Sequence, residues 1–167
     1  MLSEQLLQRL RTRVALLNDF SDDEVREFVS HCTARSVPSG QRIIAESEPG
    51  RSMFIILAGT LAVLNSRVTP ELVLARLDAG DTFGELALLD FGERSASVDT
   101  LTDVRLLEFE RGHLARIPTL QTKLYHNLAQ MLAERLRDTN AMVGMLAADT
   151  PGKAQAVTLK RLMQSRP

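Results

Sequence analysis

Between about residues 35 and 110 the sequence is cut into short apolar runs by turn-forming residues, and this punctuation limits the fold more than any other feature. The breaks include PSG at 38–40, EPG at 48–50 and DAGD at 78–81. Many short strands separated by turns at this spacing indicate an antiparallel barrel or jelly roll. The expected strands are 42–44, 52–58, 60–65, 71–77, 95–98 and 103–109.

Helical periodicity replaces the strand pattern at both ends of the chain. Residues 4–17 and 22–32 are expected to be helices, and Ser21 with Glu24 forms a capping-box pattern at the start of the second helix. The expected fold class is α+β: an antiparallel β jelly-roll barrel with N-terminal helices and a long C-terminal helix. The expected segments are 1–34 (N-terminal helices), 35–118 (barrel), 119–147 (C-terminal helix) and 148–167 (short tail).

The long C-terminal helix carries apolar residues on two faces. A helix of this length spans roughly 42 Å, which is more than a small barrel can cover. We therefore expect one face to pack on the barrel and the other to pack on a second copy, giving a homodimer. The distal stripe is Leu128, Leu132, Leu136, Thr139, Val143 and Leu146, and the second face carries Leu120, Leu124 and Met131.

Charge and cysteine content exclude several classes of protein. The 20 basic and 21 acidic side chains leave a net charge of −1, whereas a dedicated nucleic-acid binder usually has a strong basic excess. The single cysteine, Cys32, cannot form an internal disulfide or a multi-cysteine metal site. His31, His113 and His126 show no metal-ligand spacing. We expect a cytoplasmic protein with no metal.

The N-terminal segment MLSEQLLQRLRTRVALL is amphipathic and mixes charges through its apolar residues. Arg9, Arg11 and Arg13 cluster in it, so contact with a bilayer surface is one alternative. Packing of the helix on the protein's own core is the commoner use of such a pattern. The sequence has no apolar run long enough to span a membrane, and we expect no membrane partner.

The segment FGELALLDFGERSASV, residues 83–98, places two opposite charges among small and apolar residues. Gly84 allows a ligand to approach the backbone, and ELALL forms a helical turn whose amides would point back toward that glycine. Such a turn is an anion-binding concavity. Arg94 can add bidentate hydrogen bonds to phosphate oxygens, and the Glu85 carboxylate can accept from a sugar hydroxyl. The pattern predicts a pocket for a phosphorylated sugar.

The same segment resembles the phosphate-binding cassette of cyclic-nucleotide-binding domains, and PSGQRIIAESEPGRSMFIILAGTLAVL resembles the first strands and turns of that family. The resemblance covers roughly residues 15–147. It implies that Glu85 binds the ribose 2′-hydroxyl, that Arg94 binds the exocyclic oxygens of the cyclic phosphate, and that backbone amides help to hold this phosphate. The cassette residues expected at the ligand are Gly84, Glu85, Leu86, Ala87, Arg94, Ser95 and Ala96.

The stretch LAQMLAERLRDTNAMVGML resembles the dimer-forming C-helix of the bacterial catabolite activator (cAMP receptor) branch. The resemblance implies that Arg135 and Thr139 meet the purine base and that Asn140 contributes a contact from the partner subunit. DTPGKAQAVTLKRLM resembles the hinge and first helix of that branch's DNA-binding domain, but the pattern does not continue into a full reader. We therefore expect no direct DNA binding and an unknown downstream protein partner.

Cyclic AMP is the expected ligand, because the Thr139 hydroxyl can accept from the adenine amino group and donate to a ring nitrogen. Ser95 leaves cGMP open as the less favoured ligand, since the resemblance implies a hydroxyl there in receptors of both kinds. The expected mechanism is a shift between helix arrangements and not catalysis, because the sequence carries no nucleophile–base pair or hydrolase signature.

Each of these residues also has a structural interpretation. Glu85 and Arg94 can form an ion bridge with each other, Arg135 can lie on a solvated helix face, and Thr139 can belong to the seam of a coiled coil. On this alternative the protein is a dimeric scaffold with a degenerate pocket. A further alternative is a regulator that forms mixed dimers with longer relatives.

Overall fold

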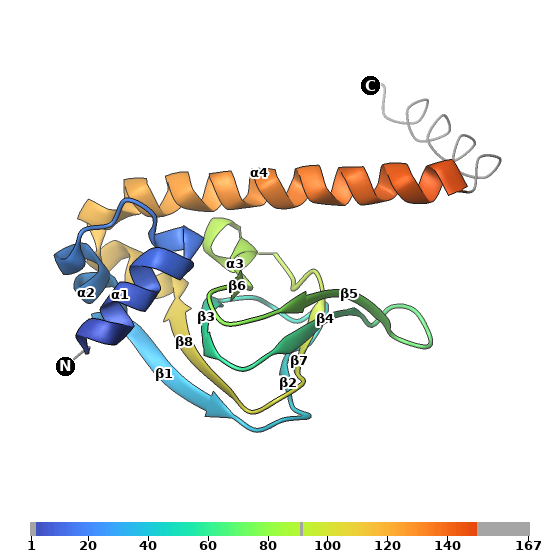
Figure 1. Cartoon of the computed structure of the whole chain (residues 1–167), viewed down its shortest axis with the longest axis horizontal. Coiled ribbons are helices and arrows are strands. Elements are labelled where there is room, and N and C mark those ends of the chain that lie inside the picture. Colours follow the sequence, from blue (N-terminus) through green and yellow to red (C-terminus); the bar gives the residue numbers. More distant parts are fainter. Residues whose placement is uncertain (1–2, 91, 150–167) are drawn as a thin grey trace. The chain divides into compact units, whose positions relative to one another are not determined.

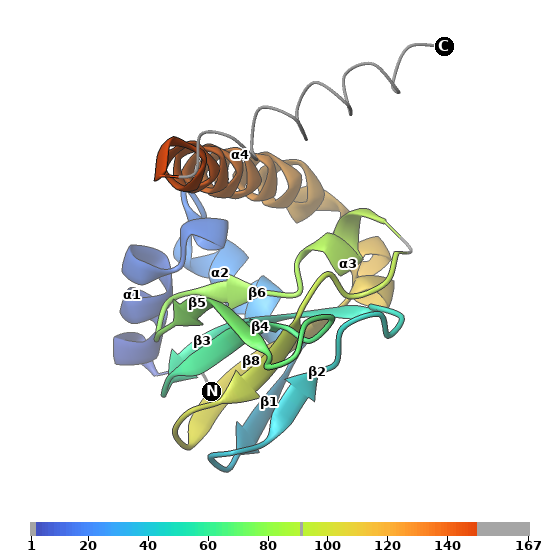
Figure 2. The same cartoon turned by 90° about the vertical axis from the view of Figure 1, so that its right-hand side faces the viewer.

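Two four-stranded antiparallel sheets form the barrel of the computed structural model, which describes residues 3–90 and 92–149. One sheet has the strand order β1-β8-β3-β6 and the other β2-β7-β4-β5 (Figure 1, Figure 2). This order is that of a jelly roll, so the predicted fold class is confirmed. The strands are β1 (Cys32–Val37), β2 (Arg42–Ile44), β3 (Ser52–Ala58), β4 (Leu61–Asn65), β5 (Leu72–Leu77), β6 (Thr82–Phe83), β7 (Ser97–Thr100) and β8 (Val104–Glu110).

Strand boundaries follow the turn residues where the apolar pattern is strong. The strands predicted at 42–44 and 52–58 coincide with β2 and β3. The prediction missed β1 and β6 and placed β7 two residues too early. β1 is exposed along most of its length, so it carries no apolar signal. It becomes a strand because it pairs antiparallel with β8 along its whole length.

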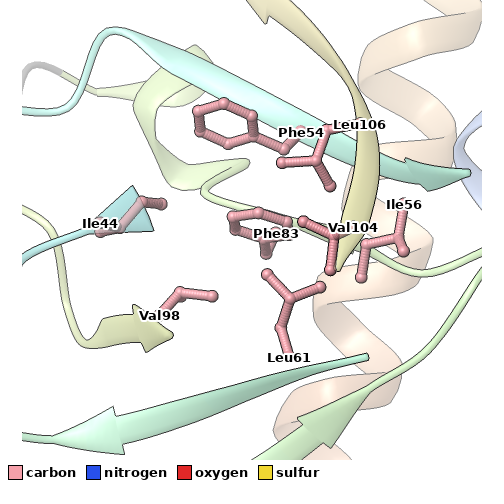
Figure 3. Packing of buried hydrophobic residues seen from close by; sticks show 8 residues of the cluster. All are labelled: Ile44, Phe54, Ile56, Leu61, Phe83, Val98, Val104 and Leu106. Carbon is pink, nitrogen blue, oxygen red and sulfur yellow. The ribbon is translucent and has the colours of Figure 1, made fainter. Parts of the chain in front are cut away.

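The hydrophobic core lies between the two sheets. Figure 3 shows how side chains from both sheets meet there, with the rings of Phe54 and Phe83 stacked at a centroid distance of 4.9 Å. Phe83 immediately precedes the segment 84–96, and Val98 follows it. The core therefore anchors both ends of that segment. Its members are Ile44, Phe54, Ile56, Leu61, Phe83, Val98, Val104 and Leu106.

The N-terminal region forms two helices and a 3-10 turn. The helix predicted for 4–17 is divided into α1 (Glu4–Arg13) and η1 (Ala15–Leu17), because Val14 between them adopts an extended conformation. Helix α2 (Asp22–Ser30) begins with the predicted capping box of Ser21 and Glu24 and ends two residues before the predicted boundary. Ion pairs link α1 to α2, from Arg11 to Asp22 and from Arg26 to Glu4.

The C-terminal part consists of η2 (Arg111–Arg116) and the long helix α4 (Pro118–Asp149). The chain divides within α4 into two compact units, Met1–Leu128 and Ala129–Pro167. Leu120, Leu124 and Leu128 are fully buried in the first unit. Most of the predicted tail, residues 150–167, lies outside the described residues. Within the part that is described, no helix is long and apolar enough to span a membrane.

Candidate functional site

The segment predicted to bind a ligand leaves the core at β6 and returns to it at β7. Gly84 follows β6 with a φ of 71°, a left-handed conformation that glycine adopts without strain. Glu85 then begins the short helix α3 (Leu86–Leu89), as the ELALL pattern predicts. We call residues 83–98 the cassette. Its two ends are held by Phe83 and Val98 in the core.

The Arg94 side chain returns toward the start of the cassette. Its Nη1 atom donates to the main-chain oxygen of Ser52 at 2.8 Å and to that of Gly84 at 3.1 Å. Two glycines make room for it: a Cβ on Gly84 would lie 2.7 Å from Nη1, and one on Gly50 would lie 3.2 Å from Nε. Within the described residues, these two main-chain oxygens hold Arg94 in a defined position.

The electrostatic surroundings of Arg94 explain why its charge is tolerated in a half-buried place. Burial lowers the pKa of the Arg94 guanidinium, while the carboxylates of Glu108, Glu85 and Glu48 act in the opposite direction. Glu85 is itself only 5% exposed. Within the described residues, the hydrogen bonds of Arg94 go to carbonyl oxygens, and Glu85 acts on Arg94 through its charge. The Nε and Nη2 groups of the guanidinium form no hydrogen bond within the part of the chain that the structure describes, and they can donate to an anion.

Main-chain amides add to the donor set of the cassette. Within the described residues, no backbone hydrogen bond engages the amides of Ser95 and Ala96. The Ala87 amide donates to the Gly84 oxygen at 3.2 Å, so contact with a phosphate would make it a three-centre donor. Together with the guanidinium, these amides give the site donors suited to a phosphate. The buried Glu85 carboxylate adds an acceptor.

The predicted base-contacting residues lie on the second unit. Arg135, Thr139 and Asn140 belong to the part of α4 that follows Leu128. The Thr139 hydroxyl donates to the Arg135 main-chain oxygen at 2.8 Å, a bond within the helix that still leaves the hydroxyl oxygen as an acceptor. The seven predicted cassette residues thus lie together in one segment. For the three helix residues, the structure gives their positions within α4. Their contact with a base stays a prediction.

Two residues that position the cassette were not foreseen. The sequence marks Gly50 only as part of a turn, whereas in the structure its missing side chain leaves space for Arg94. Arg111, in η2, donates from Nη1 to the main-chain oxygens of Ala87, within α3, and Asp90, just after α3. The amide of Arg111 also donates to the Arg51 oxygen. No local pattern marks such a residue, because its partners lie more than twenty positions away in the sequence.

Comparison with known proteins assigns the fold and the cassette to one family. The family model described as "Cyclic nucleotide-binding domain" matches residues 34–118, which include β2 to β8 and the cassette. The chain belongs to the cyclic nucleotide-binding domain family. Within the described residues, no group of three or more His, Cys, Asp and Glu side chains is placed to hold a metal ion.

Relatives of this cyclic nucleotide-binding domain occur in proteins of different kinds. The chain is 32% identical to the "Cyclic AMP receptor protein" of Thermus thermophilus, covering 89% of this chain and 69% of that protein. It is 36% identical to "Glutaminase 2" of Bradyrhizobium diazoefficiens, covering 80% of this chain and only 22% of that protein. The crystal structure of the Thermus thermophilus catabolite activator protein superposes with a TM-score of 0.72 and 33% identity, covering 80% of this chain and 63% of that one.

Proposed function

We propose that this protein is a cyclic AMP sensor that binds its ligand in the cassette. The observation that carries the proposal is the Arg94 guanidinium, held by main-chain oxygens between two glycines and beside the buried Glu85 carboxylate. A fixed cation next to an acceptor matches a cyclic phosphate joined to a ribose hydroxyl. The similarity to a protein named as a cyclic AMP receptor supports adenine as the base.

Each cassette residue has a proposed role. Arg94 binds the exocyclic phosphate oxygens, and the amides at Gly84, Leu86, Ala87, Ser95 and Ala96 surround the same group. Glu85 accepts a hydrogen bond from the ribose 2′-hydroxyl. In α4, Arg135 and Thr139 meet the purine base, and Asn140 contacts it from the second subunit of a homodimer.

The proposed action is regulation by binding. A ligand held in the cassette favours the helix arrangement for which its affinity is greater. Arg111 supplies one physical link between the cassette and the start of α4, because it joins α3 to the 3-10 turn that precedes α4. We propose that a separate protein detects the rearranged α4. The match to this chain covers 22% of the relative named as a glutaminase, so domains of this type also occur as parts of longer proteins.

Titration with cAMP and cGMP in a calorimeter tests the proposal. The wild-type protein should bind one cAMP per chain. The Arg94→Ala variant should lose at least about tenfold in affinity, because each charge-assisted hydrogen bond to phosphate contributes roughly 1.5–3 kcal/mol. The matched control is Arg116→Ala, which removes an exposed cation outside the cassette. Equal cAMP binding by Arg94→Ala and wild type would rule out the cassette as the binding site.

Two alternative functions have an observation in their favour, and the same titration separates them. Ser95 is exposed in the cassette, where its hydroxyl can serve a guanine, so tighter binding of cGMP than of cAMP would make the protein a cGMP sensor. Leu136 and Val143 are exposed on α4, as a helix that dimerises without any ligand would require. Binding of neither nucleotide, with dimers still present, would identify a scaffold with a degenerate pocket.

A further inference from the structure

The three arginines of α1, Arg9, Arg11 and Arg13, lie on two different faces of the helix. Arg11 pairs with Asp22 on α2 at 2.5 Å, in an exposed ion pair between the two helices. Arg9 and Arg13 are four positions apart and therefore project from one face of α1. Both side chains are exposed. The cluster seen in the sequence is thus one structural ion pair and two arginines that share another face.

Two hollows that share Leu6 and Arg9 lie along this second face, and together we call them the groove. One section is lined by Leu6, Arg9 and Arg13 from α1 and by Leu57 and Gly80 from the barrel. The adjoining section shares Leu6 and Arg9 and continues over Gln5 and Gln8 to Arg105 on β8. Gly80 is close enough that a Cβ on it would lie 3.0 Å from the Arg13 main-chain oxygen. The groove therefore joins α1 to the barrel within the first unit of the chain.

The groove carries an excess of positive charge. Arg9, Arg13 and Arg105 are exposed, and none of them forms a salt bridge within residues 3–90 and 92–149. The acidic residue in its lining, Glu4, is paired with Arg26 at 2.5 Å. A protein with a net charge of −1 thus places three cations that have no salt bridge among the described residues along one groove, where they attract a negatively charged partner.

We propose that this groove binds an acidic, partly apolar segment of another protein. The three arginines supply the charge complementarity. The half-buried Leu6 and Leu57, which line the same section as Arg9 and Arg13, supply apolar contact. Insertion into a bilayer is disfavoured, because Leu7 and Leu10 are buried in the domain and leave the half-buried Leu6 as the one apolar side chain that α1 (Glu4–Arg13) presents. The site is separate from the cassette, so this inference does not depend on nucleotide binding.

Fluorescence anisotropy with a labelled peptide that repeats Glu-Leu-Glu-Ser tests the proposal. A matched peptide with glutamine in place of every glutamate controls for charge. We expect the acidic peptide to bind and to be released by added salt, because exposed ion pairs are screened. The double variant Arg9→Gln with Arg105→Gln should weaken binding by about fivefold to thirtyfold, which is the loss expected for two surface ion pairs.

The control variant is Arg11→Gln, which removes an equal charge from the face that contacts α2. It should bind the acidic peptide within about twofold of the wild type, because exposed charges outside the groove contribute little. Three results would overturn the proposal: no binding of the acidic peptide, equal binding of the glutamine peptide, or equal loss in Arg11→Gln and the double variant. Binding of anionic vesicles or of single-stranded RNA in place of the peptide would also overturn it.

Discussion

At the residue scale, a glycine determines how Arg94 is held. Gly84 has a φ of 71°, and a Cβ there would lie 2.7 Å from Arg94 Nη1 and 3.2 Å from the side chain of Ile44. We predict that Gly84→Ala lowers the free energy of unfolding by roughly 1–2 kcal/mol through the left-handed backbone alone, with an additional loss from the contact with Arg94. It should also weaken cAMP binding, because the guanidinium must move.

Gly40 offers a matched control for this prediction. Its φ is 77°, yet a Cβ on it would have no neighbour within 4 Å. Gly40→Ala should therefore show the backbone cost without any effect on nucleotide binding. Urea unfolding and calorimetry of both variants provide the measurement. If the two variants have equal stability and bind cAMP equally, crowding of Arg94 by residue 84 has no role.

At the scale of elements, one buried amide joins α4 to the N-terminal region. Asn127 is 3% exposed, and its Nδ2 atom donates to the main-chain oxygens of Leu16 at 2.9 Å and Asn18 at 2.7 Å. We predict that Asn127→Ala destabilises the protein by about 2 kcal/mol, because the buried Leu16 carbonyl and the part-buried Asn18 carbonyl lose their donor. Thermal unfolding measures this, with the exposed Asn140→Ala as a control that should change little.

The contact between α2 and α4 should make stability depend on pH. The hydrogen bonds from Lys123 Nζ, at 2.8 Å, and then from the Ser21 amide lower the pKa of the Glu24 carboxyl below its ordinary value of 4.5. A lowered pKa means that the folded state prefers the carboxylate. Its stabilisation is complete above the ordinary pKa and disappears as the pH falls through the lower folded value.

The variant Lys123→Met tests this pH dependence. Wild type should lose stability more steeply than Lys123→Met as the pH falls from about 5 to about 3, because the variant has less carboxylate preference to lose. Urea unfolding at several pH values gives the slopes. Arg116→Met, which removes an exposed cation in η2, should keep the wild-type slope. Parallel slopes for wild type and Lys123→Met would contradict the prediction.

At the scale of the whole molecule, the distal part of α4 is the expected dimer contact. Leu136 and Val143 are 60% and 58% exposed, seven positions apart and therefore on one face of the helix. We predict that Leu136→Glu with Val143→Glu weakens the homodimer by at least about tenfold, because charges in an apolar seam are costly to bury. Sedimentation velocity at several concentrations measures the effect.

The control for the dimer prediction is Leu101→Glu. Leu101 is similarly exposed, at 51%, but it lies between β7 and β8 on the barrel. This variant should sediment like the wild type. A chain that is monomeric before any substitution, or dimers that persist in the double α4 variant, would show that this stripe is not the contact.

Local chemistry determined a large part of this protein from the sequence alone. Turn residues and apolar runs gave β2 and β3 their boundaries, and the capping box of Ser21 and Glu24 formed as expected. The cassette was recognisable because its glycine, its helical turn and its arginine lie within sixteen consecutive residues. Such features depend on backbone geometry and on near neighbours, which a linear pattern contains.

Only the tertiary structure decided how distant segments support that cassette. Ser52, which binds Arg94, lies 42 positions away from it, and Arg111 contacts α3 from 21 to 24 positions downstream. The exposed β1 became a strand through its pairing with β8. The three basic residues of α1 likewise separated into an ion pair and a groove only once α2 and the barrel were in place. These contacts depend on the packing of whole elements, and a hydrogen bond or ion pair across such a distance leaves no periodic signal in the chain.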